Sequence, residues 1–224
     1  MNLQPPQETL TEETSSGRPR PFSLSSVLVI LAAIGVFAAA YLLTSRPQMA
    51  VNNEAVGAVA PEVDLIELFA ATPASASSED AVTVTGKPTS GRVTVLHFWG
   101  TWCPPCKLEY PHLVELIQKH QANPALNFLT VSCESGPGET LEGIREKTLN
   151  YYDKIGVTGL QTFVDARGKT RQAAANTIGK KSMVYPTTII IGTDQKVTGV
   201  WQGYSEKSLV EMEAMIDTLL AGAA

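Results

Sequence analysis

The hydrophobic pattern of the chain separates one long apolar segment near the amino terminus from a mixed region that follows it. An apolar run covers residues 27–43 and lies within 25 residues, 21–45, that carry no charge. A helix needs roughly 20 apolar residues to cross the hydrocarbon layer of a bilayer. The pattern therefore predicts a transmembrane helix over 23–44 that contacts the lipid bilayer.

Two other interpretations of this segment are weaker. A buried core helix would normally carry a polar stripe, and none is present here. The apolar run is also longer than the roughly 7–15 residues usual in a cleaved signal peptide, although three alanines at 38–40 leave cleavage open. Arg18 and Arg20 precede the segment and Arg46 follows it, so the positive-inside rule places the amino terminus in the cytoplasm.

The remaining sequence divides into three parts around this segment. Residues 1–22 are rich in Glu, Thr, Ser, Pro and Gln, a composition that cannot bury a core. We therefore expect a disordered cytoplasmic tail over 1–22, a linker over 45–58 and one folded domain over 59–224. The range 73–80 is rich in small residues and Ser and predicts a loop.

Within the folded region the apolar spacing alternates between strand and helix periods. β-branched and aromatic residues at 92–99 predict a central strand. Further strands are expected at 126–133, 187–191 and 196–201, with shorter ones near 82–84 and 161–165. The range 62–69 is either a short strand or a turn of helix. Helical spacing occurs at 103–121, 139–155 and 208–220. The inner faces expected for these helices are Leu108, Leu113, Leu116 and Ile117; Leu141, Ile144 and Leu149; and Leu209, Met212, Met215, Ile216, Leu219 and Leu220.

The order of these elements predicts an α/β fold with a mixed sheet. A strand–helix–strand unit requires a parallel pair with a right-handed crossover. The last two strands form a hairpin, which adds antiparallel strands to the same sheet. We therefore expect a mixed central β-sheet flanked by helices on both faces.

Composition and charge exclude some functions and favour redox chemistry. The net charge of -5 gives no electrostatic reason to expect a nucleic acid partner. The three cysteines are Cys103, Cys106 and Cys133, fewer than a disulfide-stapled secreted domain would carry. Because two of them form a C-x-x-C motif, they are interpreted as catalytic rather than structural.

The C-x-x-C motif lies where a buried strand turns into a helix that begins at Cys103. Backbone amides at a helix start carry partial positive charge, which lowers the pKa of a thiol there. Cys106, one turn later, can attack a mixed disulfide on Cys103. The alternative is half of a zinc site, which needs about four ligands. The other cysteine and the three histidines do not supply a second ligand pair, so no metal and no cofactor are expected.

A second feature is Pro186, which opens a predicted strand between Tyr185 and Thr187. A proline there cannot donate a hydrogen bond to the ladder. Only about 5–6% of X–Pro bonds are cis, so an ordinary trans proline is favoured on the residues alone.

Together these motifs resemble the active site of the thioredoxin superfamily. The resemblance rests on Phe98-Trp99-Gly100-Thr101-Trp102-Cys103-Pro104-Pro105-Cys106, with Glu109, Pro111 and Tyr185-Pro186-Thr187. It is strongest to the membrane-anchored bacterial branch of TlpA, ResA and CcmG type. It implies the thioredoxin fold, a cis Pro186, and a redox disulfide in which Cys103 attacks and Cys106 resolves. Supporting residues by this resemblance are Trp102, Pro104, Pro105, Glu109, His97, Tyr185, Pro186 and Thr187.

Several residues near the motif leave alternatives open. His97 stands where the family often has Asp or Asn, and it is either a neutral base for Cys106 or a core histidine. Glu109 matches an acidic residue of the branch. Pro104 and Pro105 remove two amide donors from the helix start, which favours a reductant over a strong oxidant. Cys133 is interpreted as a small buried hydrophobe, with a third redox thiol as the alternative.

The sequence thus predicts a thiol–disulfide oxidoreductase that acts as a protein-disulfide reductase. We expect disulfide-containing exported proteins as substrates, for example in cytochrome c maturation, and a membrane electron donor of thiol-reductase type. The expected location is the bacterial inner membrane, with a single span and the catalytic domain on the periplasmic side. The alternatives are a disulfide oxidase or isomerase, and a metal- or haem-handling carrier that uses the same cysteines.

Overall fold

The computed structural model of the chain describes residues 31–36, 54–69, 83–88 and 91–222. The chain divides into two units, Met1–Arg46 and Pro47–Ala224. In the first unit, residues 31–36 are helical. None of the helices in the described ranges is long and apolar enough to cross a membrane. The predicted tail over 1–22, most of the predicted span over 23–44 and the loop over 73–80 lie outside the described residues.

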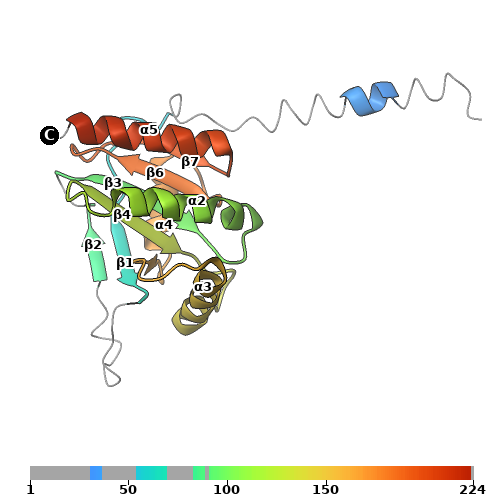
Figure 1. Cartoon of the computed structure of the whole chain (residues 1–224), viewed down its shortest axis with the longest axis horizontal. Helices are drawn as coiled ribbons and strands as arrows, with labels where there is room; N and C mark the ends of the chain where they lie inside the picture. The colour runs from blue at the N-terminus through green and yellow to red at the C-terminus, as the bar shows by residue number, and fades with distance from the viewer. Residues whose placement is uncertain (1–30, 37–53, 70–82, 89–90, 223–224) are drawn as a thin grey trace, which may run out of the picture. The chain divides into compact units, whose positions relative to one another are not determined.

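The second unit is built on one mixed sheet (Figure 1). Its strands follow the order β2 (Thr83–Gly86), β1 (Val63–Glu67), β5 (Phe163–Val164), β4 (Leu126–Ser132), β3 (Val93–Trp99), β6 (Thr187–Ile191) and β7 (Val197–Gln202). Strands β3 and β4 are parallel, and β6 pairs antiparallel with both β3 and β7. The predicted parallel unit and carboxyl-terminal hairpin are therefore confirmed.

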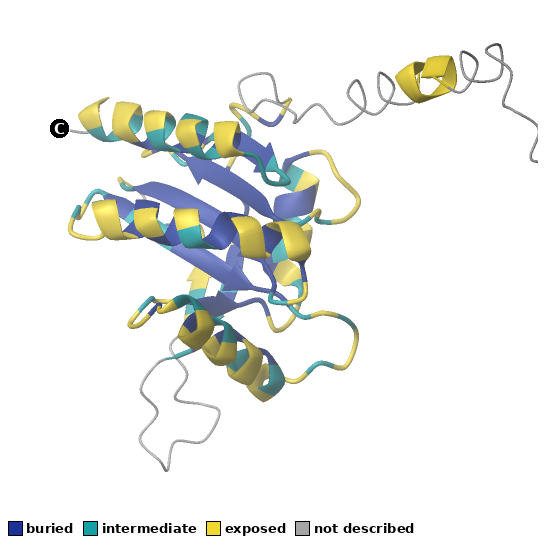
Figure 2. Cartoon of the chain, turned by 45° about the vertical axis from the view of Figure 1, so that its right-hand side comes forward, coloured by how far each residue is buried: buried dark blue, intermediate teal, exposed yellow. Residues whose placement is uncertain are grey.

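Strand β3 lies inside the sheet, between β4 and β6, and both of its faces are covered. All seven of its residues are buried, as expected of a strand with helices on both sides. Val95 and Trp99 belong to one core cluster, and Leu96 and Phe98 belong to a second cluster on the opposite face. Figure 2 shows the buried sheet between helices whose outer surfaces are exposed. Successive side chains of a strand point to opposite faces of the sheet, so the residues of β3 contribute alternately to two separate cores.

Helices cover both faces of the sheet, as the sequence predicts. They are α2 (Pro104–His120), α3 (Leu141–Ile155), α4 (Lys169–Thr177) and α5 (Glu206–Gly222). Buried residues of α2 and α5, with Tyr152 of α3, share the cluster that contains Trp99. Ala174 of α4 and the following Ile178 belong to the other cluster. Helix α4 was not predicted, because this short segment is mostly polar and buries only small residues.

The predicted inner faces of two helices were partly wrong. Leu108 is 62% exposed, because the buried stripe of α2 runs through Cys106, Tyr110 and Leu113. At about 100° per residue, position 108 lies nearly opposite positions 106 and 110. Leu141 and Leu149 of α3 are also exposed.

The buried face of α3 includes hydrogen-bonded polar side chains, whereas the apolar spacing assigned Leu141 and Leu149 to that face. The buried residues of this helix are Ile144, Thr148 and Tyr152. The Thr148 hydroxyl lies 2.9 Å from that of Ser132, and the Tyr152 hydroxyl lies 2.6 Å from that of Thr162. Since buried hydroxyls are stable when they are hydrogen-bonded, these two side chains face the sheet.

The packed region also begins before the predicted boundary at residue 59. Ala55, which we expected in the linker over 45–58, is buried. The backbone N–H of Gly57 donates to the carbonyl of Val197, at 2.8 Å, beside β7. Residues 55–58 therefore pack on the sheet, because main-chain hydrogen bonds hold a segment whose composition alone predicts a linker.

Candidate functional site

The cysteine pair lies where β3 ends and α2 begins. Cys103 is the N-cap residue of α2 and forms a disulfide with Cys106 in the first turn, with 5.3 Å between their Cα atoms. The turn between strand and helix requires a glycine at position 100. A Cβ atom there would lie only 2.4 Å from Nε1 of Trp102. Gly100 therefore lets the Trp102 ring fold back beside the disulfide.

The start of the helix offers few donors to the Cys103 sulfur. The Cys106 N–H donates to Cys103 Sγ at 3.3 Å, while the N–H of Lys107 donates to the Cys103 carbonyl. Pro104 and Pro105 occupy the first two helical positions and have no N–H. The first turn thus supplies one backbone donor to this sulfur, as the two prolines predict.

Trp102 is the exposed edge of the site. Its side chain is 41% exposed, whereas Cys103 is 3% exposed and Cys106 is fully buried. The Trp102 indole N–H donates to the Cys133 carbonyl at 3.1 Å, and its ring meets the Tyr185 ring edge-on with 5.2 Å between centroids. These contacts fix an aromatic surface beside the more accessible of the two sulfurs.

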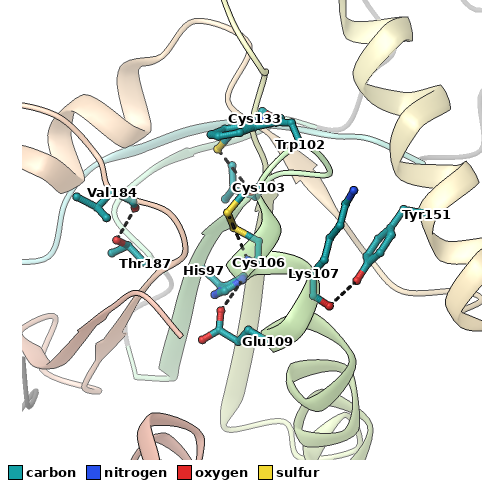
Figure 3. The surroundings of a disulfide bond; sticks show 11 residues. His97, Trp102, Cys103, Cys106, Lys107, Glu109, Cys133, Tyr151, Val184 and Thr187 are labelled. Atoms are coloured by element: carbon teal, nitrogen blue, oxygen red, sulfur yellow. Dashed lines mark hydrogen bonds and ion pairs between the residues drawn. A yellow bond between two sulfur atoms is a disulfide. The ribbon is translucent and has the colours of Figure 1, made fainter. Parts of the chain in front are cut away.

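The Tyr185–Pro186 peptide bond is cis, as the resemblance implied. The Thr187 hydroxyl donates to the Val184 carbonyl at 2.7 Å, and the Gly203 N–H donates to the Pro186 carbonyl at 2.8 Å. Figure 3 shows the Val184–Thr187 hydrogen bond to the left of the disulfide. This loop brings Tyr185 against Trp102, although the two residues are far apart in the sequence.

His97 and Glu109 lie on the other side of the disulfide from Cys133 and Trp102 (Figure 3). Each is 1% exposed, and His97 Nε2 is 3.7 Å from Glu109 Oε2. His97 Nδ1 is 2.9 Å from the Thr188 hydroxyl. Burial lowers the pKa of His97 to about 3 and raises the pKa of Glu109 to about 8. Both shifts favour the uncharged forms, because ionised side chains are poorly solvated in the core.

Cys133 is a free, buried thiol at the end of β4. Its Sγ atom lies 3.6 Å from the Val131 carbonyl. Burial raises the pKa of Cys133 to about 12. Since the thiolate is the reactive form, such a thiol is unreactive at neutral pH. These observations favour a core side chain over a third redox thiol.

A hollow of about 540 Å³ that the sequence does not predict lies beside Trp102 and Tyr185. Arg171 of α4 and Glu134 form an ion pair along this hollow. The backbone N–H of Arg171 donates to Asp165 Oδ2 at 2.8 Å. No sequence signal indicates this grouping, because its members come from an unpredicted helix and from loops that only the sheet brings together.

The remaining histidines do not join the site. His112 is exposed near Glu115, and His120 lies 3.5 Å from Asp217. Across the described ranges, no group of three or more His, Cys, Asp or Glu side chains is arranged to hold a metal ion. The ionisable and redox-active groups that the structure gathers around the disulfide are the two cysteines and the buried His97–Glu109 pair.

Comparisons with known proteins agree with this geometry. The sequence profile of the AhpC/TSA family matches residues 56–200. The chain is 31% identical over 115 residues to the thiol–disulfide oxidoreductase ResA of Oceanobacillus iheyensis, a match that covers 51% of this chain and 54% of ResA. It thus spans about half of that relative. ResA of Geobacillus thermodenitrificans is 28% identical over 170 residues, covering 70% of this chain and 87% of the relative.

The fold also has solved counterparts. A thiol:disulfide interchange protein of the thioredoxin family from Chlorobium tepidum superposes with a TM-score of 0.53 at 19% identity. The superposition covers 73% of this chain and 97% of that structure. At this identity the likeness concerns the fold alone.

Proposed function

Because this chain belongs to the AhpC/TSA family and has the thioredoxin fold, we propose that it is a thiol–disulfide oxidoreductase working through Cys103 and Cys106. The observation that carries the proposal is the disulfide at the start of α2, which lies beside the aromatic surface of Trp102 and Tyr185. The two ResA proteins described above are named as thiol–disulfide oxidoreductases.

In the proposed reaction the two cysteines have different roles. Cys103 is the more exposed residue of the two, and its sulfur accepts a hydrogen bond at the helix start, so Cys103 is the attacking thiolate. It forms a bond with one sulfur of a substrate disulfide, and the other substrate sulfur leaves as a thiolate. Cys106 then loses its proton and attacks Cys103 Sγ, which releases the second substrate thiol. The protein becomes the disulfide, and the substrate gains two electrons and two protons.

The helix start supports the reducing direction. A strong oxidant is one whose reduced form is unusually stabilised, usually through a low thiol pKa. With Pro104 and Pro105 at the first two positions, Cys106 supplies the one backbone N–H that the first turn offers to Cys103 Sγ. We therefore propose a protein-disulfide reductase rather than an oxidase or isomerase.

The cellular setting is proposed from the sequence. The uncharged segment at 21–45 supports a membrane anchor over 23–44, and the flanking arginines support a periplasmic catalytic domain at the bacterial inner membrane. Disulfide-containing exported proteins, for example in cytochrome c maturation, would then be substrates. The electron donor would be a thiol reductase in the same membrane.

The test is the redox equilibrium of the full chain, purified in detergent and equilibrated with glutathione or dithiothreitol mixtures. A reversible dithiol couple with a potential near or below roughly -250 mV is expected of a reductase. A potential of about -180 to -120 mV would reverse the proposed direction in favour of oxidation or isomerisation. If no reversible couple formed, the redox assignment would fail and metal binding under reducing conditions would be measured next.

Cysteine variants assign the two roles. Cys106→Ser should accumulate a mixed disulfide with a disulfide-bonded substrate peptide, because no resolving thiol remains. Cys103→Ser should not, because Cys106 is fully buried. Cys133→Ser is the matched control and should behave as the unaltered protein does. Trapping through Cys106 in the Cys103→Ser variant would contradict the assignment.

A further inference from the structure

The hollow beside Trp102 carries one positive and one negative side chain in its wall. Its volume of about 540 Å³ lies within the roughly 300–1,000 Å³ typical of sites for small ligands. Glu134 and Arg171 line it and form an ion pair with each other. The other residues that line it are uncharged, with Ser135, Gln172 and Ser182 among them. The wall therefore presents one carboxylate and one guanidinium side by side.

The hollow borders the reactive cysteine. Trp102, which directly precedes Cys103, lines the hollow and is 41% exposed. Its indole N–H donates to the carbonyl of Cys133, the residue that directly precedes Glu134. Figure 3 shows Trp102 and Cys133 together on one side of the Cys103–Cys106 disulfide. A small molecule bonded to Cys103 Sγ therefore lies at the edge of this hollow.

The fold fixes Arg171 from behind and leaves part of its charge open to the hollow. The carboxyl of Asp165 is fully buried and accepts the backbone N–H groups of Thr170 and Arg171 at 3.3 and 2.8 Å. Asp165 Oδ2 also lies 4.0 Å from Arg171 Nε. The side chains of Arg171 and Glu134 are each 23% exposed. Because a guanidinium has five N–H donors and a carboxylate about four acceptor positions, both keep bonding capacity beyond their mutual contact.

The chemical group that matches this pair carries both charges itself. The headgroup of a free amino acid has an ammonium, which pairs with the carboxylate of Glu134, and a carboxylate, which pairs with the guanidinium of Arg171. A segment inside a protein chain lacks this combination, because its α-amino and α-carboxyl groups are joined in amides. Since the hollow borders a cysteine that exchanges disulfides, the matching ligand is a small disulfide with such a headgroup.

We propose that the hollow binds the amino-acid headgroup of a small disulfide, such as cystine or glutathione disulfide, which Cys103 and Cys106 then reduce. The proposal rests on the redox function above and extends its substrates beyond proteins. The Cys103 thiolate bonds to one sulfur of the small disulfide, and the other sulfur leaves as the first thiol. Cys106 then attacks Cys103 Sγ and releases the second thiol. The protein dithiol becomes the disulfide, and its two electrons and two protons leave on the two small thiols.

The test is a single-turnover reaction of the reduced full chain, purified in detergent, with small disulfides that differ in charge. Cystine and glutathione disulfide carry both charges of the headgroup, cystamine carries the ammonium alone, dithiodipropionate the carboxylate alone, and hydroxyethyl disulfide neither. Samples are quenched in acid and alkylated, and the Cys103–Cys106 disulfide is counted by mass spectrometry. Each rate is divided by the rate of the same protein with hydroxyethyl disulfide, and these relative rates are compared between variants.

Two variants separate the two charges. Arg171→Gln should lower the relative rates of the zwitterionic substrate and of dithiodipropionate by about 10-fold, the lower end for loss of a hydrogen bond to a charged group, and should spare cystamine. Glu134→Gln should lower those of the zwitterionic substrate and of cystamine and spare dithiodipropionate. Lys154→Gln and Glu146→Gln change exposed residues of α3 outside the hollow and should alter no relative rate. Comparing cystine with glutathione disulfide shows which of the two depends on Arg171 and Glu134.

A second test needs no variant, because enantiomers have the same intrinsic reactivity. Contacts at the sulfur, the ammonium and the carboxylate fix three groups around one α carbon, so a single enantiomer satisfies all of them. The unaltered protein should therefore reduce the L and D forms of cystine, or glutathione disulfides with L- and D-γ-glutamyl groups, at rates about 10-fold apart. Equal rates within both pairs would overturn the proposal even if the variants of Arg171 and Glu134 did not fold.

The outcomes distinguish this inference from the function on which it rests. If the reduced protein reacts with hydroxyethyl disulfide and neither variant of the hollow changes any relative rate, the headgroup site is excluded while the redox function stands. If the unaltered protein reacts with none of the disulfides and forms no reversible dithiol couple, the proposed function itself fails.

Discussion

The buried His97–Glu109 pair should give the oxidised protein a plateau of stability between about pH 4.5 and 6.5. Folding lowers the pKa of His97 from 6.5 to about 3. Between about pH 3 and 6.5 the unfolded chain therefore binds more protons than the folded chain, and stability rises with pH. Folding raises the pKa of Glu109 from 4.5 to about 8, so the folded chain binds more protons and stability falls with pH. Where the two ranges overlap, the opposite slopes cancel.

The size of the effect follows from the same values. Each group changes the free energy of unfolding by about 1.4 kcal/mol per pH unit within its range. Outside the overlap, each limb extends over about 1.5 units, from pH 3 to 4.5 for His97 and from 6.5 to 8 for Glu109. The free energy of unfolding should therefore fall by about 2 kcal/mol on either side of the plateau. Both side chains are 1% exposed, so solvent screens these effects little.

Glu109→Gln tests this reasoning, because the amide cannot ionise. In this variant the free energy of unfolding should stay level between pH 6.5 and 8, where the unaltered protein loses stability. The assay is urea unfolding of the oxidised full chain at a series of pH values. Glu115→Gln, at an exposed position of the same helix, should keep the loss. If Glu109→Gln lost stability over this range as the unaltered protein does, the carboxyl of Glu109 would not be its cause.

Three packing predictions use unfolding free energies as the measurement. Leu113→Ala should lower the free energy of unfolding by about 2–5 kcal/mol because Leu113 is fully buried, whereas Leu108→Ala at 62% exposure should lower it by less than about 0.5 kcal/mol. Equal losses of stability would contradict the observed buried face of α2. Gly199→Ala places a Cβ 2.6 Å from the buried Trp201 ring and should cost about 1–3 kcal/mol, while Gly136→Ala has open space and should change little. Tyr152→Phe removes a hydroxyl that is hydrogen-bonded to Thr162 and Tyr110 and should cost about 1–2 kcal/mol, and an unchanged free energy of unfolding would show that these bonds contribute nothing.

The sequence predicted most of the sheet and misplaced parts of the helices for physical reasons. Strand β3 is recognisable because both of its faces are buried, so nearly every position is apolar or β-branched. Leu108 misled the prediction because an apolar residue was assumed to face inward, yet the helix period places it opposite Cys106 and Tyr110. Helix α4 was missed because it packs through small residues such as Ala174, which produce no clear apolar period.

The cysteine chemistry could be predicted from the sequence, but its surroundings could not. The C-x-x-C spacing alone places Cys103 and Cys106 in one helical turn, because the distance is set by local geometry. By contrast, Trp102 meets Tyr185 across more than eighty residues of chain, and Arg171 meets Glu134 in the hollow beside them. Such contacts depend on strand order and register, which local patterns do not specify.

The sequence by itself determined the redox pair, the mixed α/β order and the two prolines that limit hydrogen bonding to Cys103. These follow from spacing within a few residues, where covalent geometry fixes which groups can meet. Only the tertiary structure decided that His97 faces Glu109 in the core, since the packing of α2 on β3 determines which of their side chains meet. The pKa values of both groups arise from removal of water by the packed sheet and helices. Desolvation is a property of the assembled fold, so the acid–base character of this site exists only once the chain is folded.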